Sequence, residues 1–229
     1  MEQASNVAKS GDGYAVTWAA VLANGNPWHF GEHVVASVVG KDAGGREVFR
    51  MDQPLDAVPP GGSLTFTGQG TATAKPAKVS VDYRPAQWRQ AARMPSAFRP
   101  FPASRVQTMR QKDGSYLITG YVANPYQLPA SSLVVSALLR DNAGKLLGGG
   151  STFVDDVQAG RPPRFILTVA GLPPGTKVGR TEVVARTWGS TARPYEELAM
   201  GGVMPLHTVK PTTAPFQTDR GSELSSGSE

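Results

Sequence analysis

Tyr121-Val122-Ala123-Asn124 repeats a pattern found 100 residues earlier in the chain, at Val21-Leu22-Ala23-Asn24. Further matches keep the same order along the sequence at nearly the same spacing. Self-similarity at a long, fixed period is the signature of a repeated structural unit, so the sequence predicts two copies of one fold. The other matches are Asp12-Gly13 with Asp113-Gly114, Val34-Val35-Ala36-Ser37 with Val134-Val135-Ser136-Ala137, Asp42-Ala43-Gly44 with Asn142-Ala143-Gly144, and Asp56, Val58, Gly61 and Phe66 with Asp155, Val157, Gly160 and Phe165.

Towards the end of each copy the spacing grows. Arg84-Pro85 matches Arg193-Pro194 and Met94-Pro95 matches Met204-Pro205, at offsets of 109 and 110. This drift predicts a longer loop in the second copy around residues 171–175. Trp88 and Trp188 are also 100 residues apart, but that register conflicts with the downstream matches, so we interpret their spacing as coincidence.

The local pattern within each copy is typical of β-strands. Apolar side chains alternate at Val16, Trp18, Ala20 and Leu22, which places one set against a core and the other towards solvent. Residues 34–40 and 133–139 are near-continuous apolar strands, and turns rich in Asn, Asp and Gly follow them. Short strands separated by such turns predict an all-β chain of two tandem immunoglobulin-like β-sandwich domains.

Composition shifts divide the chain into four segments. We predict a first sandwich at residues 1–94, a Pro/Arg linker at 95–104, a second sandwich at 105–210 and a disordered tail at 211–229. Residues 87–93 and 195–200 are each predicted to form a short helix after the last strand of their copy. Repetition of this kind predicts an extended rod.

A family resemblance rests on the second copy, in residues 120–124, 134–139, 140–148, 157–160 and 164–165. This pattern resembles the FxLYD-type immunoglobulin-like domain. The first copy resembles it more loosely, and Arg140-Asp141-Asn142 departs from the family, which has an aromatic residue before Asp. The resemblance implies a bacterial sandwich outside the cytoplasm, so the expected location is the cell envelope or the secreted fraction, although the sequence has no intact signal peptide at Met1.

The composition excludes several classes of protein. The 229 residues include no Cys, so there is no disulfide, thiolate zinc site or cysteine nucleophile. His29 and His33 lie four apart in an expected loop rather than a helix, so we expect no metal site. The acidic pairs 155–156 and 196–197 are neighbours, whereas a glycosidase needs two carboxylates that face one bond. The sequence contains no phosphate loop or nucleophile elbow, so we expect neither a cofactor nor an enzyme.

Arginines provide one candidate binding site. The net charge is +5, and no acidic residue lies between Asp82 and Asp113. Arginines interleaved with aromatic residues are suited to an anionic polymer or a membrane surface, whereas nucleic acid is not expected. The alternative, which we favour, is that these side chains hold the two domains together. The candidate arginines are Arg84, Arg89, Arg93, Arg99 and Arg105.

Loop aromatics provide the second candidate. Trp28 and Phe30 in the first copy and Tyr126 in the second lie in matching loops at one end of each sandwich. They either bind a ligand or a partner, as sandwich loops often do, or plug the open end of the core. The leading functional interpretation is a non-catalytic binding or structural module with a protein partner. The alternative is a subunit of a larger phage-like or secretion assembly that uses the basic linker as an interface.

Overall fold

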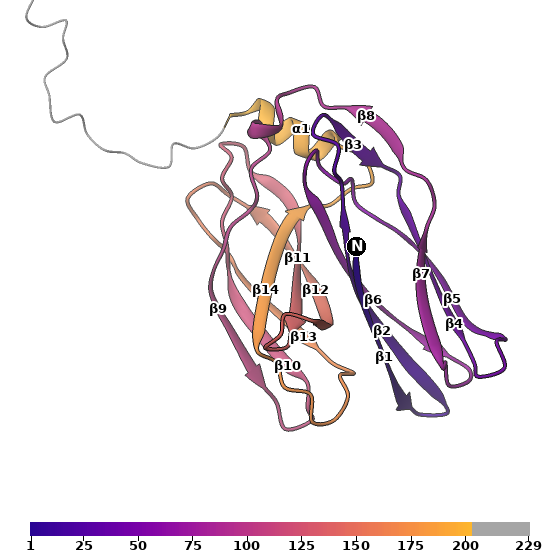
Figure 1. Cartoon of the computed structure of the whole chain (residues 1–229). Coiled ribbons are helices and arrows are strands. Elements are labelled where there is room, and N and C mark those ends of the chain that lie inside the picture. Colours follow the sequence, from indigo (N-terminus) through magenta and orange to yellow (C-terminus); the bar gives the residue numbers. More distant parts are fainter. Residues whose placement is uncertain (203–229) are drawn as a thin grey trace, which may run out of the picture.

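A computed structural model describes residues 1–202 and confirms an all-β chain with two sandwiches (Figure 1). Its only α-helix follows the last strand of this described part. The first sandwich contains β1 (Glu2–Ser10), β2 (Gly13–Ala23), β3 (His29–Glu32), β4 (Val35–Lys41), β5 (Glu47–Pro54), β6 (Ser63–Ala72), β7 (Lys78–Tyr83) and β8 (Gln87–Gln90). A 3-10 turn, η1 (Pro95–Ala97), leads to the second sandwich, with β9 (Ala103–Arg110), β10 (Tyr116–Val122), β11 (Ala130–Arg140), β12 (Leu146–Val157), β13 (Arg164–Val169), β14 (Arg180–Thr187) and α1 (Arg193–Met200).

The two sandwiches have the same strand order, as the repeat predicts. In the first, sheet β1-β2-β6 packs on sheet β5-β4-β7, and in the second, β9-β10-β13 packs on β12-β11-β14. These pairs correspond to the A-B-E and C′-C-F sheets of an immunoglobulin-like sandwich. The first sandwich also has a two-stranded ribbon, β3-β8, for which the second has no equivalent in the part described.

Asn24 and Asn124 explain why the quoted stretch recurs. Each side-chain amide is buried and donates to a carbonyl oxygen across the loop, at Val58 for Asn24 and at Val157 for Asn124. Each side-chain oxygen accepts the backbone N–H two residues on. Because a buried amide without these partners would cost free energy, the loop that follows β2 or β10 has to fold in the same way in both copies.

Strand register corrects part of the sequence alignment. Val35 and Ser37 of β4 occupy the positions of Val134 and Ser136 of β11, so the offset in these strands is 99 rather than 100. Across β7 and β14 the offset becomes 102, because three extra residues lie in the loop after β13, where we predict a longer loop. Arg84 therefore corresponds to Arg186, and the match of Arg84-Pro85 with Arg193-Pro194 is wrong. Residues 204–205 lie outside the described part of the chain.

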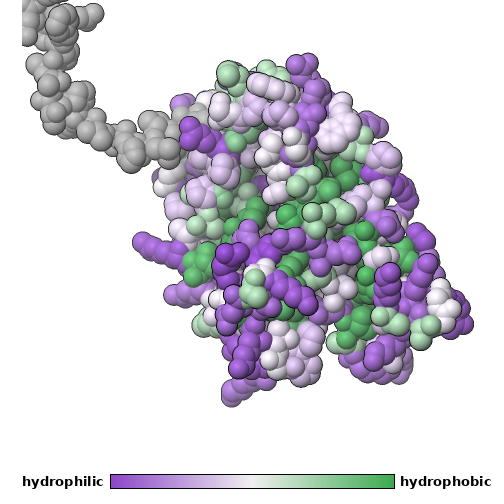
Figure 2. All heavy atoms as spheres, in the orientation of Figure 1, coloured by the Kyte–Doolittle hydropathy of each residue, from purple (hydrophilic) through white to green (hydrophobic). Residues whose placement is uncertain are grey.

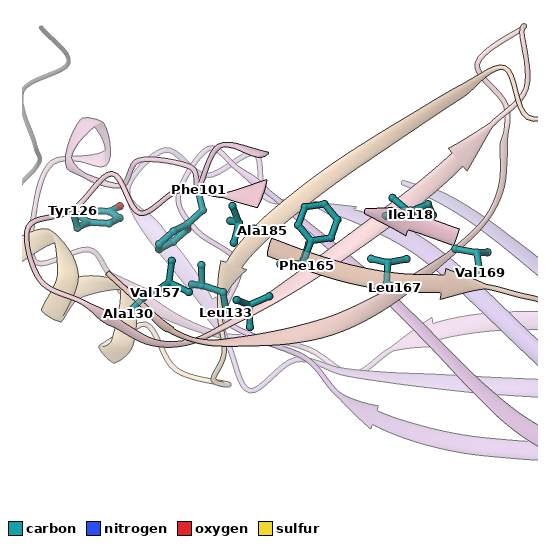
Figure 3. Packing of buried hydrophobic residues seen from close by; sticks show 14 of the residues in the cluster. Phe101, Ile118, Tyr126, Ala130, Leu133, Val157, Phe165, Leu167, Val169 and Ala185 are labelled. Atoms are coloured by element: carbon teal, nitrogen blue, oxygen red, sulfur yellow. The ribbon is translucent and has the colours of Figure 1, made fainter. Parts of the chain in front are cut away.

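Each sandwich has its own apolar core. The predicted alternation in β2 is confirmed, because Val16, Trp18 and Ala20 are buried in the first core. In the second core, side chains from β10, β11, β12 and β13 meet between the sheets, and Tyr126 closes the end nearest α1 (Figure 3). Each core is large enough to stabilise its sandwich through burial of apolar surface.

The prediction of an extended rod is wrong, because the sandwiches lie side by side along their length (Figure 1). Strand β12 runs against β1, β2 and β6, so the four sheets stack in the order β5-β4-β7, β1-β2-β6, β12-β11-β14, β9-β10-β13. The second face of β2, which we expect in solvent, is covered by the second sandwich. Ala19 of this face packs on Leu138 and Leu146 in a small cluster between the sandwiches.

Small side chains allow this close approach. Gly148-Gly149-Gly150 lies within β12, and a Cβ added at Gly149 would be 3.0 Å from Cγ2 of Thr67 in the first sandwich. The Thr67 hydroxyl bonds the Ser151 hydroxyl at 3.0 Å, and the Asn6 amide donates to the Leu147 carbonyl at 2.9 Å. Figure 2 shows hydrophobic side chains in patches along the middle of the molecule, with hydrophilic ones around the periphery.

A buried ion pair joins the sandwiches at one end. Nε of Arg186 lies 2.6 Å from the Asp56 carboxylate, which also accepts the Gly189 N–H. Burial raises the pKa of the Asp56 carboxyl above its usual value, although both neighbours oppose this, and burial lowers the pKa of Arg186. Because both charges are removed from water, loss of either partner would leave the other uncompensated.

Secondary structure after the last strands differs from prediction in one copy. Residues 195–200 form most of α1, as predicted, but residues 87–90 form strand β8 instead of a helix. Strand β8 pairs with β3, so the tertiary partner overrides the local helical pattern.

Candidate functional site

One end of the molecule gathers most of the residues that the sequence singles out. Ribbon β3-β8 of the first sandwich and α1 of the second lie together there, next to the 3-10 turn η1 (Figure 1). Two backbone contacts tie this end together: the His33 N–H donates to the Ser190 carbonyl, and the Ala57 N–H donates to the Gly189 carbonyl. The end therefore behaves as one surface built from both sandwiches.

A cluster of buried aromatic rings lies beneath this surface. The Tyr195 ring of α1 lies between 5.5 and 6.4 Å from the rings of Phe30, Phe98, Phe101 and Tyr126. Phe30 and Tyr126 are both 0 % exposed, so neither ring offers a face to a ligand. For these two residues the structure therefore corrects the binding interpretation: Tyr126 closes the end of the second core, and Phe30 of the first sandwich packs on Phe98 and Tyr195.

Hydrogen bonds fix the cluster at Arg99. The backbone N–H of Arg99 donates to the Tyr126 hydroxyl, and the Arg99 carbonyl accepts from the hydroxyls of Tyr126 and Tyr195, at 3.0 and 2.9 Å. Burial raises the pKa of both tyrosines, so they remain neutral donors. The contribution of Arg99 here is its backbone, and its side chain is exposed.

An ionic cluster covers the aromatic rings. Arg89 of β8 lies 2.7 Å from the Glu196 carboxylate and 3.6 Å from that of Glu32. Glu196 also accepts the Ala92 N–H, and Glu32 accepts the Ala192 N–H at 2.6 Å. The hydrogen bond with Glu196 is the main cause of a raised pKa of Arg89. Arg89 thus bridges the two sandwiches, as the favoured alternative for the arginines requires.

The structure does not gather the five candidate arginines into one patch. Arg84 forms an ion pair with Asp52 on the far sheet of the first sandwich. Arg105 lies on β9, with its guanidinium 5.8 Å from the centre of the Tyr121 ring. Arg93 and Arg99 are exposed beside η1, and neither forms a salt bridge within residues 1–202.

Three of the four tryptophans are more than half exposed at or near this end. Trp28, Trp88 and Trp188 have exposed fractions of 54 %, 59 % and 51 %, whereas Trp18 is in the core. Tryptophan is enriched at protein interfaces, because its large ring buries much apolar area when a partner covers it. Trp28 was a predicted site residue, and Trp88 is one of the aromatic residues interleaved with the candidate arginines, whereas sequence reasoning missed Trp188. The only signal for Trp188 was residue type, since its spacing of 100 from Trp88 does not match the strand register.

Two shallow pockets adjoin these rings. Trp88 lies opposite Gly31 in the β3-β8 ribbon and lines a pocket of about 170 Å³ together with Tyr83 and Val34. Trp188 contacts the exposed Phe153 edge-on at 5.3 Å and lines a second pocket of about 430 Å³ with Pro129. Apolar walls with an aromatic rim are suited to side chains of a binding partner.

The histidines and carboxylates of the described residues are the side chains on which a metal site would depend. Among residues 1–202, no three His, Asp or Glu side chains are placed to hold a metal ion. His29 contacts the Asn26 side chain at 3.1 Å, Glu196 is held by Arg89, and Glu197 pairs with Arg193. His207 lies outside the described residues. The helix of this described part is too short and polar to cross a membrane.

Comparisons with known proteins find little. No family model and no curated protein matches the sequence. Among solved structures, the chain is similar to a glycosyl hydrolase family 2 member from Bacteroides cellulosilyticus, with 11% identity over 75% of this chain and 28% of that one, at a TM-score of 0.25. It is also similar to the N-terminal CBM22-1-CBM22-2 tandem domain of Xyn10C from Paenibacillus barcinonensis, with 10% identity over 86% and 87% of the two chains, at a TM-score of 0.16.

The chain spans less than a third of the length of that glycosyl hydrolase. TM-scores this low do not establish a shared arrangement, so the functional argument rests on the geometry of the chain itself.

Proposed function

We propose that this protein is a non-catalytic binding module that presents one rigid end, built from both sandwiches, to a protein partner. The observation that carries the proposal is the set of exposed rings, Trp28, Trp88 and Trp188, at or near the end held by α1 and the β3-β8 ribbon. Tryptophan is enriched among the residues that dominate binding energy at protein interfaces.

Rigidity supports this proposal. The exposed rings lie on elements joined by the Asp56–Arg186 pair, by the Arg89 bridge and by the buried aromatic cluster. A surface that is already ordered loses little conformational entropy on binding, so more of the contact energy appears as affinity. The FxLYD resemblance remains the reason for placing this module in the bacterial cell envelope or the secreted fraction.

The alternative is a structural or adaptor subunit of a larger assembly. The exposed side chains of Arg93 and Arg99 favour it, because they flank η1 without an acidic partner among the described residues. In that case an acidic neighbouring subunit would cover this segment. Fractionation of cells separates the two proposals: an envelope module is found with the envelope, whereas an assembly subunit sediments with the particle.

Site-specific photocrosslinking in the native cell tests the binding proposal. A photoreactive phenylalanine replaces Trp88 in one variant and, as a matched control, Arg46, an exposed residue in the β4–β5 turn. We expect a discrete crosslinked product from position 88 that position 46 does not give. Equal labelling at both positions, or none at position 88, would contradict a partner surface at this end.

A further inference from the structure

The stack of four sheets has two outer faces, one on each sandwich. Sheet β5-β4-β7 forms the outer face of the first, and sheet β9-β10-β13 forms that of the second, since the other two sheets pack on each other. Neither outer face is covered by other elements of the described chain. A comparison of the two faces shows which one is suited to a partner.

The outer face of β9-β10-β13 has an apolar strip next to the polar side chains of Gln107, Thr119 and Thr168. Because Ile118 and Leu167 point into the core, their neighbours Leu117 and Ile166 point outwards. Ile166 is 53 % exposed, and Met109, which pairs with Leu117, is 48 % exposed. An exposed apolar strip on a flat sheet is a feature of interaction surfaces.

The charges around this strip have one sign. Strands β9, β10 and β13 contain no Asp or Glu, and Arg105 and Arg164 lie beside the strip. Arg110 pairs with the core residue Tyr116, so it belongs to the inner side of the sheet. None of these arginines forms a salt bridge with residues 1–202. The nearest acidic residue along the chain, Asp113, lies in the turn after β9, where its carboxylate accepts hydrogen bonds from Ser115.

The opposite outer face is a solvated one. Strands β5, β4 and β7 carry both signs of charge, and two pairs form on this face: Arg50 with Glu47, and Asp52 with Arg84, which directly follows β7. The Ser37 hydroxyl of β4 donates to Asp52. Paired charges of this kind are stable in water and give a partner little to recognise.

We propose that the outer face of β9-β10-β13 is a second docking surface, for a protein partner with an apolar patch ringed by Asp and Glu side chains. The apolar strip supplies buried area, and the unpaired arginines supply electrostatic complementarity, which speeds association and selects an acidic partner. A second copy of this chain fits less well, because a two-fold contact would bring together two faces that both carry unpaired arginines and no acidic residue. The surface is separate from the exposed tryptophans and does not depend on them.

Binding of a labelled random copolymer of Glu and Tyr to the full chain, followed by fluorescence anisotropy, tests this proposal. We expect Arg164→Glu to weaken binding by about tenfold or more, as loss of a complementary charge should. Ile166→Thr should weaken binding of the Glu-Tyr copolymer and leave binding of a polymer of Glu alone unchanged. The matched control is Arg46→Glu, which makes the same charge change at an exposed turn.

Three outcomes would overturn the proposal. Equal weakening by Arg46→Glu would mean that only net charge matters, and absence of binding in low salt would remove the acidic partner. A dimer of the wild type that Ile166→Thr converts to a monomer would make this face an interface between copies. Thermal unfolding of each variant checks that the fold is intact, and both substituted side chains are exposed enough for this to be expected. Loss of crosslinking at Trp88 would leave this proposal unaffected.

Discussion

Sheets β5-β4-β7 and β12-β11-β14 occupy the same place in the two sandwiches but face different surroundings. The first faces solvent, and the second faces the other sandwich. Three corresponding pairs show the effect: Arg84 and Arg186, Arg50 and Gly149, Ser37 and Ser136. Arg84, Arg50 and Ser37 face solvent and bond residues of their own sheet or next to it. At the junction, Arg186 bonds Asp56 of the first sandwich, Gly149 has no side chain, and the Ser136 hydroxyl is buried.

This difference separates two kinds of sequence information. Positions that determine the topology, such as Asn24 and Asn124, keep the same bonds in both copies. On the outward face of the sheet, the type of side chain differs between the copies according to whether solvent or the other sandwich covers that face. In β11 both faces are buried, which is why residues 133–139 are apolar almost without interruption.

The largest expected effect on stability comes from substituting Arg186, and its counterpart Arg84 provides the comparison. Arg186→Leu leaves the Asp56 carboxylate buried without its partner, which should lower the free energy of unfolding by about 3–5 kcal/mol. Arg84→Leu removes an exposed ion pair at the corresponding position and should cost about 0–1 kcal/mol. Urea unfolding measures both, and equal losses would mean that the junction does not bury this pair.

The stability of the Arg186→Leu variant should depend on pH differently from that of the wild type. Burial already raises the pKa of Asp56 with Arg186 present, and removal of the guanidinium raises it further. A carboxyl whose pKa is higher in the folded state binds a proton more tightly in the folded state than in the unfolded state. The free energy of unfolding therefore increases as the pH falls towards that pKa. Arg186→Leu should therefore regain stability between neutral and mildly acidic pH, relative to the wild type. A constant difference at all pH values would contradict this.

A smaller effect should follow from filling the junction. Gly149→Val places a Cβ 2.6 Å from the Ala137 carbonyl oxygen and close to Thr67, so we expect overpacking to cost about 1–3 kcal/mol. Arg50→Val at the corresponding exposed position should change stability by about 0.5 kcal/mol or less. Thermal unfolding compares the two variants, and a harmless Gly149→Val would show that the sheets are not in close contact.

The smallest expected effect has the opposite sign. The Ser136 hydroxyl is buried and has no partner within the described residues, whereas the Ser37 hydroxyl bonds Asp52 at 2.7 Å. Ser136→Ala removes an unsatisfied group and should raise the free energy of unfolding by up to about 1 kcal/mol. Ser37→Ala should lower it slightly. Destabilisation by Ser136→Ala would indicate that the hydroxyl has a partner after all, such as an ordered water.

Much of the fold could be predicted from local patterns, and the errors have physical causes. The strands, the glycine turns and the longer loop after β13 follow from side-chain periodicity and backbone requirements. The helix predicted at residues 87–93 is wrong because β3 pairs with that segment. The alignment of Val34 with Val134 is wrong by one residue, since similar apolar residues fit either register when both faces of β11 are buried.

The candidate site was predictable only in part. Its location near the loops and the linker could be predicted, and so could the bridging role of an arginine, which Arg89 performs. The exposure of each residue could not be predicted, because Trp28 and Phe30 are only two residues apart, yet Trp28 before β3 is exposed and Phe30 within β3 is buried. The burial of Phe30 depends on residues distant in the sequence, because its ring packs on Phe98 and Tyr195 at the junction.

The sequence by itself determined the all-β class, the position of most strands and the repeat of the pattern, because these depend on periodicity and turn residues that act within each copy. Tertiary structure alone decided how the copies meet. A side-by-side junction needs small residues on β12, a charge pair between Asp56 and Arg186 and a helix α1 that covers the end. These contacts join positions that are far apart in the sequence, from Thr67 and Gly149 to Glu32 and Ala192. No local pattern encodes such pairs, because each partner is compatible with solvent until the other covers it.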